Sequence, residues 1–109
     1  RRVVDQQPRR LELATQLEAA RLLVYNAARL KLARQPFLKE AAMAKLFASE
    51  AAVANSMDGM RIFGGYSYST DYDIERKFRE TRLYQVAPIS TNLILSHVAT
   101  HDLGMPKSF

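Results

Sequence analysis

Residues 61–68 read Arg-Ile-Phe-Gly-Gly-Tyr-Ser-Tyr, and this stretch interrupts a long alanine-rich segment with two adjacent glycines. Glycine adopts positive φ readily, ends helices, and lets another molecule approach the backbone where a Cβ would obstruct it. A simple turn needs only one glycine. The pair Gly64-Gly65 therefore predicts the end of a helix, and it leaves open a second use in contact with a ligand or another subunit.

Helical periodicity dominates the chain on both sides of this turn. Apolar residues recur at steps of three and four, which is typical of helices that bury one face. The four expected helices span residues 9–34, 36–63, 74–86 and 88–102. Residues 1–7 are expected to be an irregular lead-in. The pattern predicts an all-α fold, an up-and-down four-helix bundle, formed by residues 1–109 as a single domain.

The apolar stripes also predict which residues face the core. The second helix is expected inside the bundle, because its stripe consists largely of alanines and small side chains let helices approach closely. Asp73 is predicted to cap the third helix, and Ser90 and Thr91 stand where they can cap the fourth. The predicted core residues are Leu13, Leu17, Ala20, Leu23, Val24, Ala27, Leu30, Phe37, Ala41, Ala44, Phe47, Ala51, Ala54, Ile74, Phe78, Leu83, Leu93, Ile94, Val98 and Leu103.

Composition disfavours several classes of function. The chain has no cysteine, so a disulfide framework and a thiolate metal site are excluded, and no apolar run reaches the length of a membrane span. The net charge is +5, but the basic residues are dispersed among carboxylates, which disfavours nucleic acid as a partner. His97 and His101 stand four residues apart, as two metal ligands can, but no third ligand is evident nearby, so no metal is predicted.

Four segments, taken in order, resemble the C-terminal helical domain of the acyl-CoA dehydrogenase family. Together they cover roughly residues 11–85 and are far more specific as an ordered set than any one of them. They are the two helical segments Ala-Thr-Gln-Leu-Glu-Ala-Ala-Arg-Leu-Leu-Val-Tyr at 14–25 and Lys-Glu-Ala-Ala-Met-Ala-Lys-Leu-Phe-Ala-Ser-Glu at 39–50, the turn Ile-Phe-Gly-Gly-Tyr at 62–66, and Ile-Glu-Arg-Lys-Phe-Arg-Glu at 74–80.

The resemblance implies an FAD-dependent oxidoreductase that oxidises the α,β bond of an acyl-CoA thioester. It implies that this chain is a C-terminal fragment, inactive alone, of a larger flavoprotein. The bundle is then expected to contact FAD and to form the subunit interface of a homo-oligomer, a dimer or a tetramer. An electron-transfer protein is a further expected partner. The implied location is the bacterial cytoplasm or the mitochondrial matrix, since no targeting signal is visible.

Some positions of this sequence match the family's cofactor-binding residues, and others differ from them. Gly64 and Gly65 match the family's flavin-facing glycines, and Ser67 replaces a further glycine. Arg61 stands where many members have a flavin-contacting glutamine, and its charge suits a diphosphate. Ser90 matches a threonine that keeps its hydroxyl, and Asn92 matches a flavin-contacting glutamine or glutamate. The implied cofactor-binding residues are therefore Arg61, Gly64, Gly65, Ser90 and Asn92.

The family's usual catalytic glutamate is missing, because Pro88 occupies its position and proline cannot take a proton. No catalytic residue is predicted in this chain. In some members the base lies on an earlier helix, which would place it outside these residues; alternatively, the protein uses the flavin differently or not at all. We favour the first explanation. From a different functional class, the chain is alternatively a non-catalytic helical interaction module with a basic surface.

Overall fold

The computed structural model describes residues 7–107, and every regular element within them is helical. Residues 1–6, most of the predicted lead-in, and residues 108–109 lie outside the described part. The predicted all-α fold is confirmed, and the predicted helix boundaries are close to those observed. The elements are α1 (Gln7–Leu32), α2 (Leu38–Phe63), the 3-10 helix η2 (Gly64–Tyr68), α3 (Ile74–Val86) and α4 (Thr91–His101).

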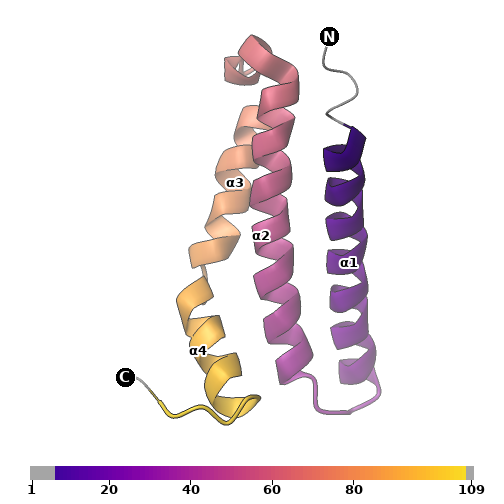
Figure 1. Ribbon diagram of the computed structural model, residues 1–109, viewed down its shortest axis with the longest axis vertical. Coiled ribbons are helices and arrows are strands. Elements are labelled where there is room, and N and C mark those ends of the chain that lie inside the picture. Colours follow the sequence, from indigo (N-terminus) through magenta and orange to yellow (C-terminus); the bar gives the residue numbers. More distant parts are fainter. Residues whose placement is uncertain (1–6, 108–109) are drawn as a thin grey trace.

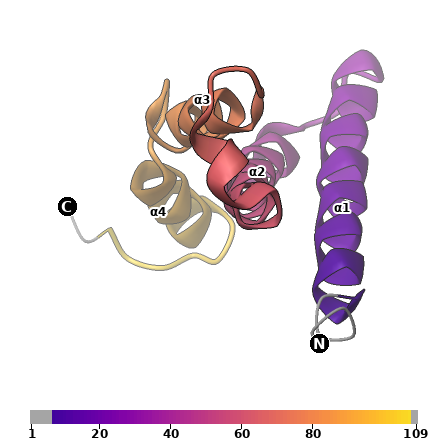
Figure 2. The same cartoon turned by 90° about the horizontal axis from the view of Figure 1, so that it is seen from above.

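α1, α2 and α3 alternate in direction, as predicted for an up-and-down arrangement, and α4 continues in the direction of α3 (Figure 1). α1 runs down, α2 returns, and α3 and α4 descend in succession along α2, with an overall long dimension of 49 Å. Seen from above, α2 lies between α1 on one side and α3 and α4 on the other (Figure 2). The glycine turn and the junction of α3 with α4 are therefore at different heights along the same central helix.

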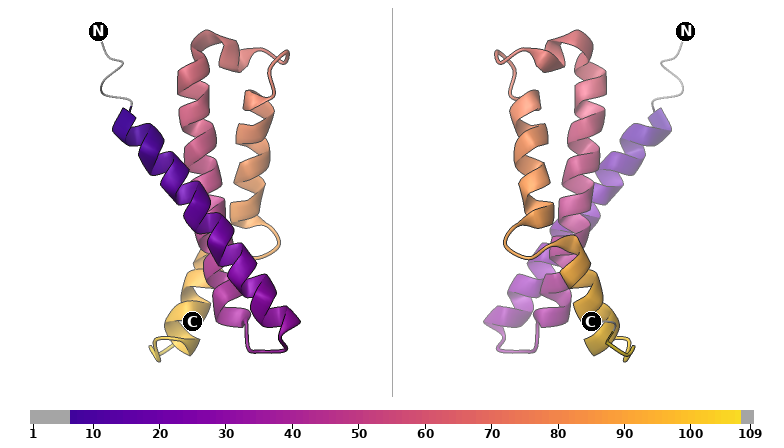
Figure 3. Two further views of the ribbon diagram at one scale, coloured as in Figure 1. Left: turned by 90° about the vertical axis from the view of Figure 1, so that its right-hand side faces the viewer. Right: turned by 90° about the vertical axis from the view of Figure 1, so that its left-hand side faces the viewer.

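α1 and α2 cross each other (Figure 3), and the buried apolar residues of these two helices are four alanines. Ala20 and Ala27 of α1 and Ala44 and Ala51 of α2 are all buried. Because the hairpin loop is centred near residue 35, Ala20 lies level with Ala51, and Ala27 lies level with Ala44. Within each helix the two alanines are seven residues apart, so they lie on the same helix face. We call these four residues the alanine seam. Small side chains along it let the two backbones approach closely.

The predicted core was too wide. The alanine seam and Ile94 are buried as predicted, whereas six other predicted core residues are exposed: Leu17, Val24, Ala54, Leu83, Leu93 and Leu103. Leu17 and Val24 flank the seam on the side that no other described helix covers. Leu103 lies beyond the last residue of α4. Periodicity identifies the apolar face of a helix. How much of that face is buried depends on which helices pack against it.

The two predicted helix caps differ in outcome. Ser90 has an extended backbone and its side chain accepts a hydrogen bond from the Leu93 amide, so the cap of α4 is confirmed. Asp73 makes no side-chain cap, because its backbone is already helical (φ −68°, ψ −9°), a conformation that directs the carboxylate away from the amides of the first turn. Asp73 instead pairs with Arg76 at 3.0 Å, and this hydrogen bond is the main reason that the pKa of Arg76 is raised.

A lysine connects α2 to the junction between α3 and α4. The Lys45 ammonium donates hydrogen bonds to the carbonyl of Tyr84 (2.9 Å), near the end of α3, and to the carbonyl of Ile89. Both carbonyls lie where helical hydrogen bonding stops and acceptors lack partners within the helix. Lys45 thereby fixes the height at which α3 gives way to α4.

The alanine seam predicts a position-specific effect of side-chain size. Ala51→Leu should lower the free energy of unfolding by about 1–3 kcal/mol, because the extra carbons force α1 and α2 apart. Ala54→Leu, an exposed position one turn further along α2, is the matched control and should change stability little. Urea denaturation of the two variants measures the difference. Equal effects at both positions would show that the seam is not a close contact.

Candidate functional site

The two adjacent glycines have different structural roles. Gly64 ends α2 with φ +60° and ψ −133°, a backbone conformation that residues with a Cβ rarely adopt. Its amide donates a hydrogen bond to the Met60 carbonyl. Gly65 has no positive φ, and a Cβ built on it meets no atom of the described chain within 4 Å. The backbone therefore requires glycine at position 64. Nothing within the described residues requires it at position 65.

Aromatic side chains surround the turn. Tyr72 contacts both Phe63 and Tyr66 edge to face, with ring centroids 5.6 and 5.7 Å apart. Ser67 is buried, whereas Tyr66 and Tyr68 are largely exposed. The turn thus has a packed inner side, and its exposed residues include both glycines and the two tyrosines that follow them. Ser67, which replaces a glycine expected from the resemblance, lies on the inner side.

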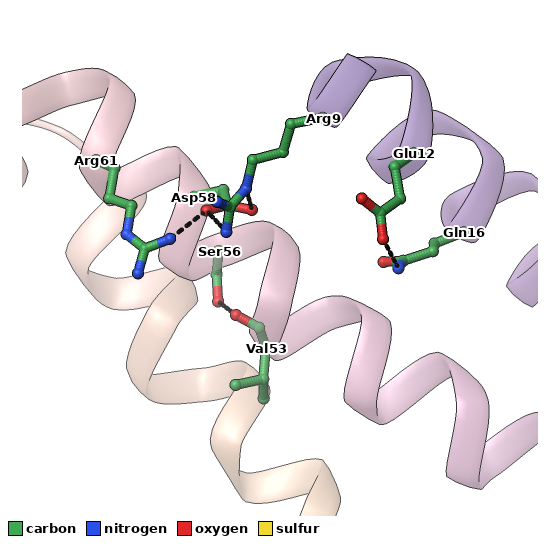
Figure 4. Close-up of polar contacts among 7 residues, drawn as sticks. All are labelled: Arg9, Glu12, Gln16, Val53, Ser56, Asp58 and Arg61. Carbon is green, nitrogen blue, oxygen red and sulfur yellow. Dashed lines mark hydrogen bonds and ion pairs between the residues drawn. The ribbon is translucent and has the colours of Figure 1, made fainter. Parts of the chain in front are cut away.

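A buried carboxylate lies one helical turn before Arg61. Asp58 is only 7% exposed, and its oxygens pair with two arginines (Figure 4). Arg9 binds it in a bidentate manner, with Nε–Oδ2 at 2.9 Å and an Nη2–Oδ1 distance of 2.8 Å. Arg61 donates from Nη1 to Oδ1 at 2.9 Å. We call these three residues the arginine clamp.

Two members of the arginine clamp were missed by the sequence prediction. The spacing of Asp58 and Arg61 places them on one helix face, which is a recognisable signal for an ion pair. Arg9 lies 49 positions from Asp58, and no local pattern reveals that contact. Only the crossing of α1 over α2 brings its guanidinium to the carboxylate.

The remaining predicted site residues lie elsewhere. Ser90 and Asn92 stand at the start of α4, where Ser90 is the helix cap and the Asn92 side chain is exposed. The glycine turn precedes α3 and this junction follows it. Since α3 has 13 residues, the two places are about 20 Å apart along its axis. The structure therefore groups Arg61, Gly64 and Gly65 together and holds Ser90 and Asn92 apart from them.

The junction carries no candidate base. Pro88 is exposed between α3 and α4. The sequence contains no carboxylate between Glu80 and Asp102, so the whole of α4 and the junction before it lack an acidic side chain. The junction offers hydroxyl and amide groups for binding, and the imidazoles of His97 and His101 stand further along α4.

An apolar groove runs along α2 between α1 and α3. It consists of two cavities, of about 500 and 430 Å³, that share Ala52 as a lining residue. Its walls include Leu17 and Val24 from α1 and Tyr84 from α3, all exposed. The groove is the surface left uncovered when α1 and α3 pack on α2 without covering the face between them. We call it the α2 groove.

The two histidines form a stacked pair. The rings of His97 and His101 lie 4.3 Å apart between centroids, and His101 Nδ1 is 3.1 Å from the His97 carbonyl oxygen. Within residues 7–107 no three metal-ligating side chains come together. None of the helices in that same range combines the length and the apolar character that crossing a membrane requires.

An all-α arrangement with an exposed glycine turn defines a helical domain, and comparison with known proteins identifies it. The family model for the acyl-CoA dehydrogenase C-terminal domain matches residues 5–100. This chain belongs to the acyl-CoA dehydrogenase family and corresponds to its C-terminal domain.

Individual relatives agree with this assignment. The human mitochondrial short-chain specific acyl-CoA dehydrogenase is 49% identical over 97 residues, covering 89% of this chain and 24% of its own length. An acyl-CoA dehydrogenase of Bacillus subtilis is 48% identical over 75 residues, 69% of this chain and 20% of its own. The butyryl-CoA dehydrogenase of Megasphaera elsdenii superposes with a TM-score of 0.88 at 33% identity, over 95% of this chain and 27% of that one. The chain thus spans about a quarter of the relatives it matches.

The two glycines should respond differently to alanine. Gly64→Ala should lower the free energy of unfolding by about 1–2 kcal/mol, because alanine is strained at positive φ. Gly65→Ala should leave the stability of the isolated chain unchanged or slightly raised, since its Cβ enters open space. Thermal unfolding of both variants provides the measurement. A strongly destabilised Gly65→Ala would mean that this glycine serves the fold.

Proposed function

We propose that this chain is the C-terminal domain of an FAD-dependent acyl-CoA dehydrogenase-like oxidoreductase, which oxidises the α,β bond of an acyl-CoA thioester. The observation that carries the proposal is Gly65. It is exposed, its backbone conformation is open to any residue, and no described atom of the chain fills the space that a Cβ would take. A glycine with no use inside the chain is explained by close approach of something outside it.

The chemistry of the turn fits one part of FAD in particular. Amides without a covering side chain and the Arg61 guanidinium offer donors suited to a diphosphate. The exposed rings of Tyr66 and Tyr68 provide flat apolar surface beside them. When bound, FAD supplies the two-electron acceptor that oxidation of the acyl chain requires. The turn itself binds and orients the cofactor.

Ser90 and Asn92 contribute a second contact in this proposal. The Ser90 hydroxyl accepts a hydrogen bond from the Leu93 amide, so its position is fixed. The side-chain amide of Asn92 is exposed and remains available to a ligand. Their separation from the glycine turn, about 20 Å along α3, suits the two ends of an elongated dinucleotide or two FAD molecules in an oligomer. We favour the second arrangement, in which the turn meets the FAD of a neighbouring subunit.

The base that removes the substrate α-proton lies outside this chain in our proposal. Pro88 occupies the expected position, and the junction and α4 contain no carboxylate. A general base must come within hydrogen-bond reach of the proton it takes. The role of this domain is then to cover the flavin, exclude water and hold the subunits together.

The exposed apolar surface supports assembly. The α2 groove exposes mainly apolar surface, of the kind that marks contact sites between protein chains. We propose that the full protein is a homo-oligomer, a dimer or a tetramer, that binds acyl-CoA and passes electrons to a partner protein. Its relatives include a mitochondrial and a bacterial enzyme, which supports the mitochondrial matrix or the bacterial cytoplasm as its location.

The alternative, an interaction module with a basic surface, has weaker support. The basic side chains of α3 are largely paired with carboxylates of the same helix or its start: Arg76 with Asp73 and Glu80, and Arg79 with Glu75. Pairing of this kind reduces the net positive potential that an acidic partner would meet.

The colour of the purified full-length protein distinguishes the two functions. The proposal predicts a yellow protein whose visible flavin absorbance bleaches when its acyl-CoA is added anaerobically. A colourless protein that takes up no FAD on reconstitution would favour the interaction module. A yellow protein that no acyl-CoA bleaches would support the flavin site and contradict the dehydrogenase activity.

Gly65→Val in the full-length protein tests the turn itself. We expect it to lower FAD affinity at least tenfold, since the branched side chain occupies the space in which the cofactor approaches the backbone. Absorbance titration of the apoprotein with FAD gives the affinity, and sedimentation gives the oligomeric state. The matched control is Gly65→Ala, which should have a smaller effect of the same sign. Unchanged FAD affinity and unchanged assembly in Gly65→Val would contradict the proposed role of the turn.

A further inference from the structure

The arginine clamp carries more positive charge than its single carboxylate neutralises, and some of its N–H donors are not used by that carboxylate. Asp58 is buried, and a buried carboxylate without partners is strongly destabilising. The bidentate contact with Arg9 already satisfies both oxygens. Arg61 then adds a third contact, at an oxygen that Arg9 also occupies. Both contacts stabilise the buried carboxylate, and the one from Arg61 also restrains a largely exposed guanidinium.

The location of Arg61 suggests a second role for its contact with Asp58. It lies in the last turn of α2, three residues before the helix ends at Gly64, and its side chain is 62% exposed. Among the described residues, Arg61 makes one contact, from Nη1 to Asp58. The other guanidinium N–H groups, on Nε and Nη2, remain as donors on the last turn of α2, which the glycine turn follows. Figure 4 shows the Arg61 guanidinium held on one side of Asp58 and that of Arg9 on another.

We propose that Asp58 is a positioning residue for cofactor binding: it holds the Arg61 guanidinium in one orientation on the last turn of α2, so that the remaining N–H donors meet the diphosphate of FAD. This inference rests on the proposed function. A free arginine side chain samples many rotamers, and fixing it in advance removes the cost of ordering it on binding. The hydrogen bond from Nη1 to Oδ1 supplies that restraint while leaving the rest of the guanidinium exposed.

Arg9 makes the arrangement compatible with an anionic ligand. The charges of Asp58 and Arg61 sum to zero. With these two residues only, an approaching diphosphate would be repelled by the carboxylate as much as it is attracted by the guanidinium. With Arg9 included, the clamp carries one net positive charge. Arg9 also connects the start of α1 to the end of α2, so the turn is held in place relative to two helices rather than one.

A double-mutant cycle on the full-length protein tests the inference. The four proteins are the wild type, Asp58→Asn, Arg61→Gln and the double variant, and the quantity measured is the FAD dissociation constant of each apoprotein. Asp58→Asn should weaken FAD binding about tenfold when Arg61 is present, because a coupled pair in contact has an interaction energy of this order. In the Arg61→Gln background the same substitution should change it less than about twofold.

The outcomes separate positioning from a structural role. If Asp58→Asn weakens FAD binding equally in both backgrounds, Asp58 acts through the fold and the inference is wrong. If Asp58→Asn has no effect with Arg61 present, it is also wrong. A Gly65→Val variant that loses FAD while Arg61→Gln retains it would leave the proposed function standing and remove this inference alone. Loss in neither variant would remove both.

Two further variants allow the same measurement if a first substitution prevents folding. Where Asp58→Asn does not assemble, Asp58→Glu replaces it in the same cycle. Glutamate keeps the charge and changes the geometry of the pair with Arg61 by one methylene, so a smaller coupling of the same sign is expected. Arg61→Lys should restore part of the affinity lost in Arg61→Gln, and this gain should not depend on Asp58, since a lysine ammonium lacks the planar fork. Full dependence of the lysine variant on Asp58 would contradict the proposed geometry.

Discussion

α1 and α2 meet through alanines, and the rest of the structure follows from that close approach. Ala20, Ala27, Ala44 and Ala51 are four of the five buried apolar residues in the described chain. Because they are small, the two helices cross with little side-chain material between them, and the larger apolar residues are displaced to the margins. Close packing therefore leaves Leu13, Leu17 and Val24 of α1 at the edges of the α2 groove. The domain is stabilised along one narrow seam and has abundant apolar surface for other contacts.

The same crossing organises the polar chemistry at the other end of α2. α1 begins beside the end of α2, which brings Arg9 to Asp58 across 49 positions of sequence. A buried carboxylate with two guanidiniums is a costly arrangement unless every oxygen is satisfied, and here both are. The glycine turn that follows is thus fixed at its base and open at its tip. Such a combination suits a surface that receives a ligand carried by another part of the protein.

Sequence reasoning succeeded where the determining interactions are local. The order of helices, the glycine turn and the Ser90 cap were predicted correctly, because helical periodicity, positive φ and first-turn amides are short-range effects. It failed where burial depends on neighbours. Leu83 and Leu93 occupy apolar faces, yet no described helix covers them. Asp73 is of a type that caps helices, but its helical backbone conformation prevents the cap, and residue type alone does not determine that conformation.

The sequence by itself determined the fold class, the family and the candidate residues of the turn, since each depends on residue types at fixed spacing along the chain. Only the tertiary structure divided those residues into two groups separated by the length of α3, distinguished the glycine that the backbone needs from the one that it does not, and joined Arg9 to Asp58. The physical reason is distance along the chain. Contacts between residues far apart in sequence depend on how the helices cross, and that crossing is set by the summed packing of the alanine seam.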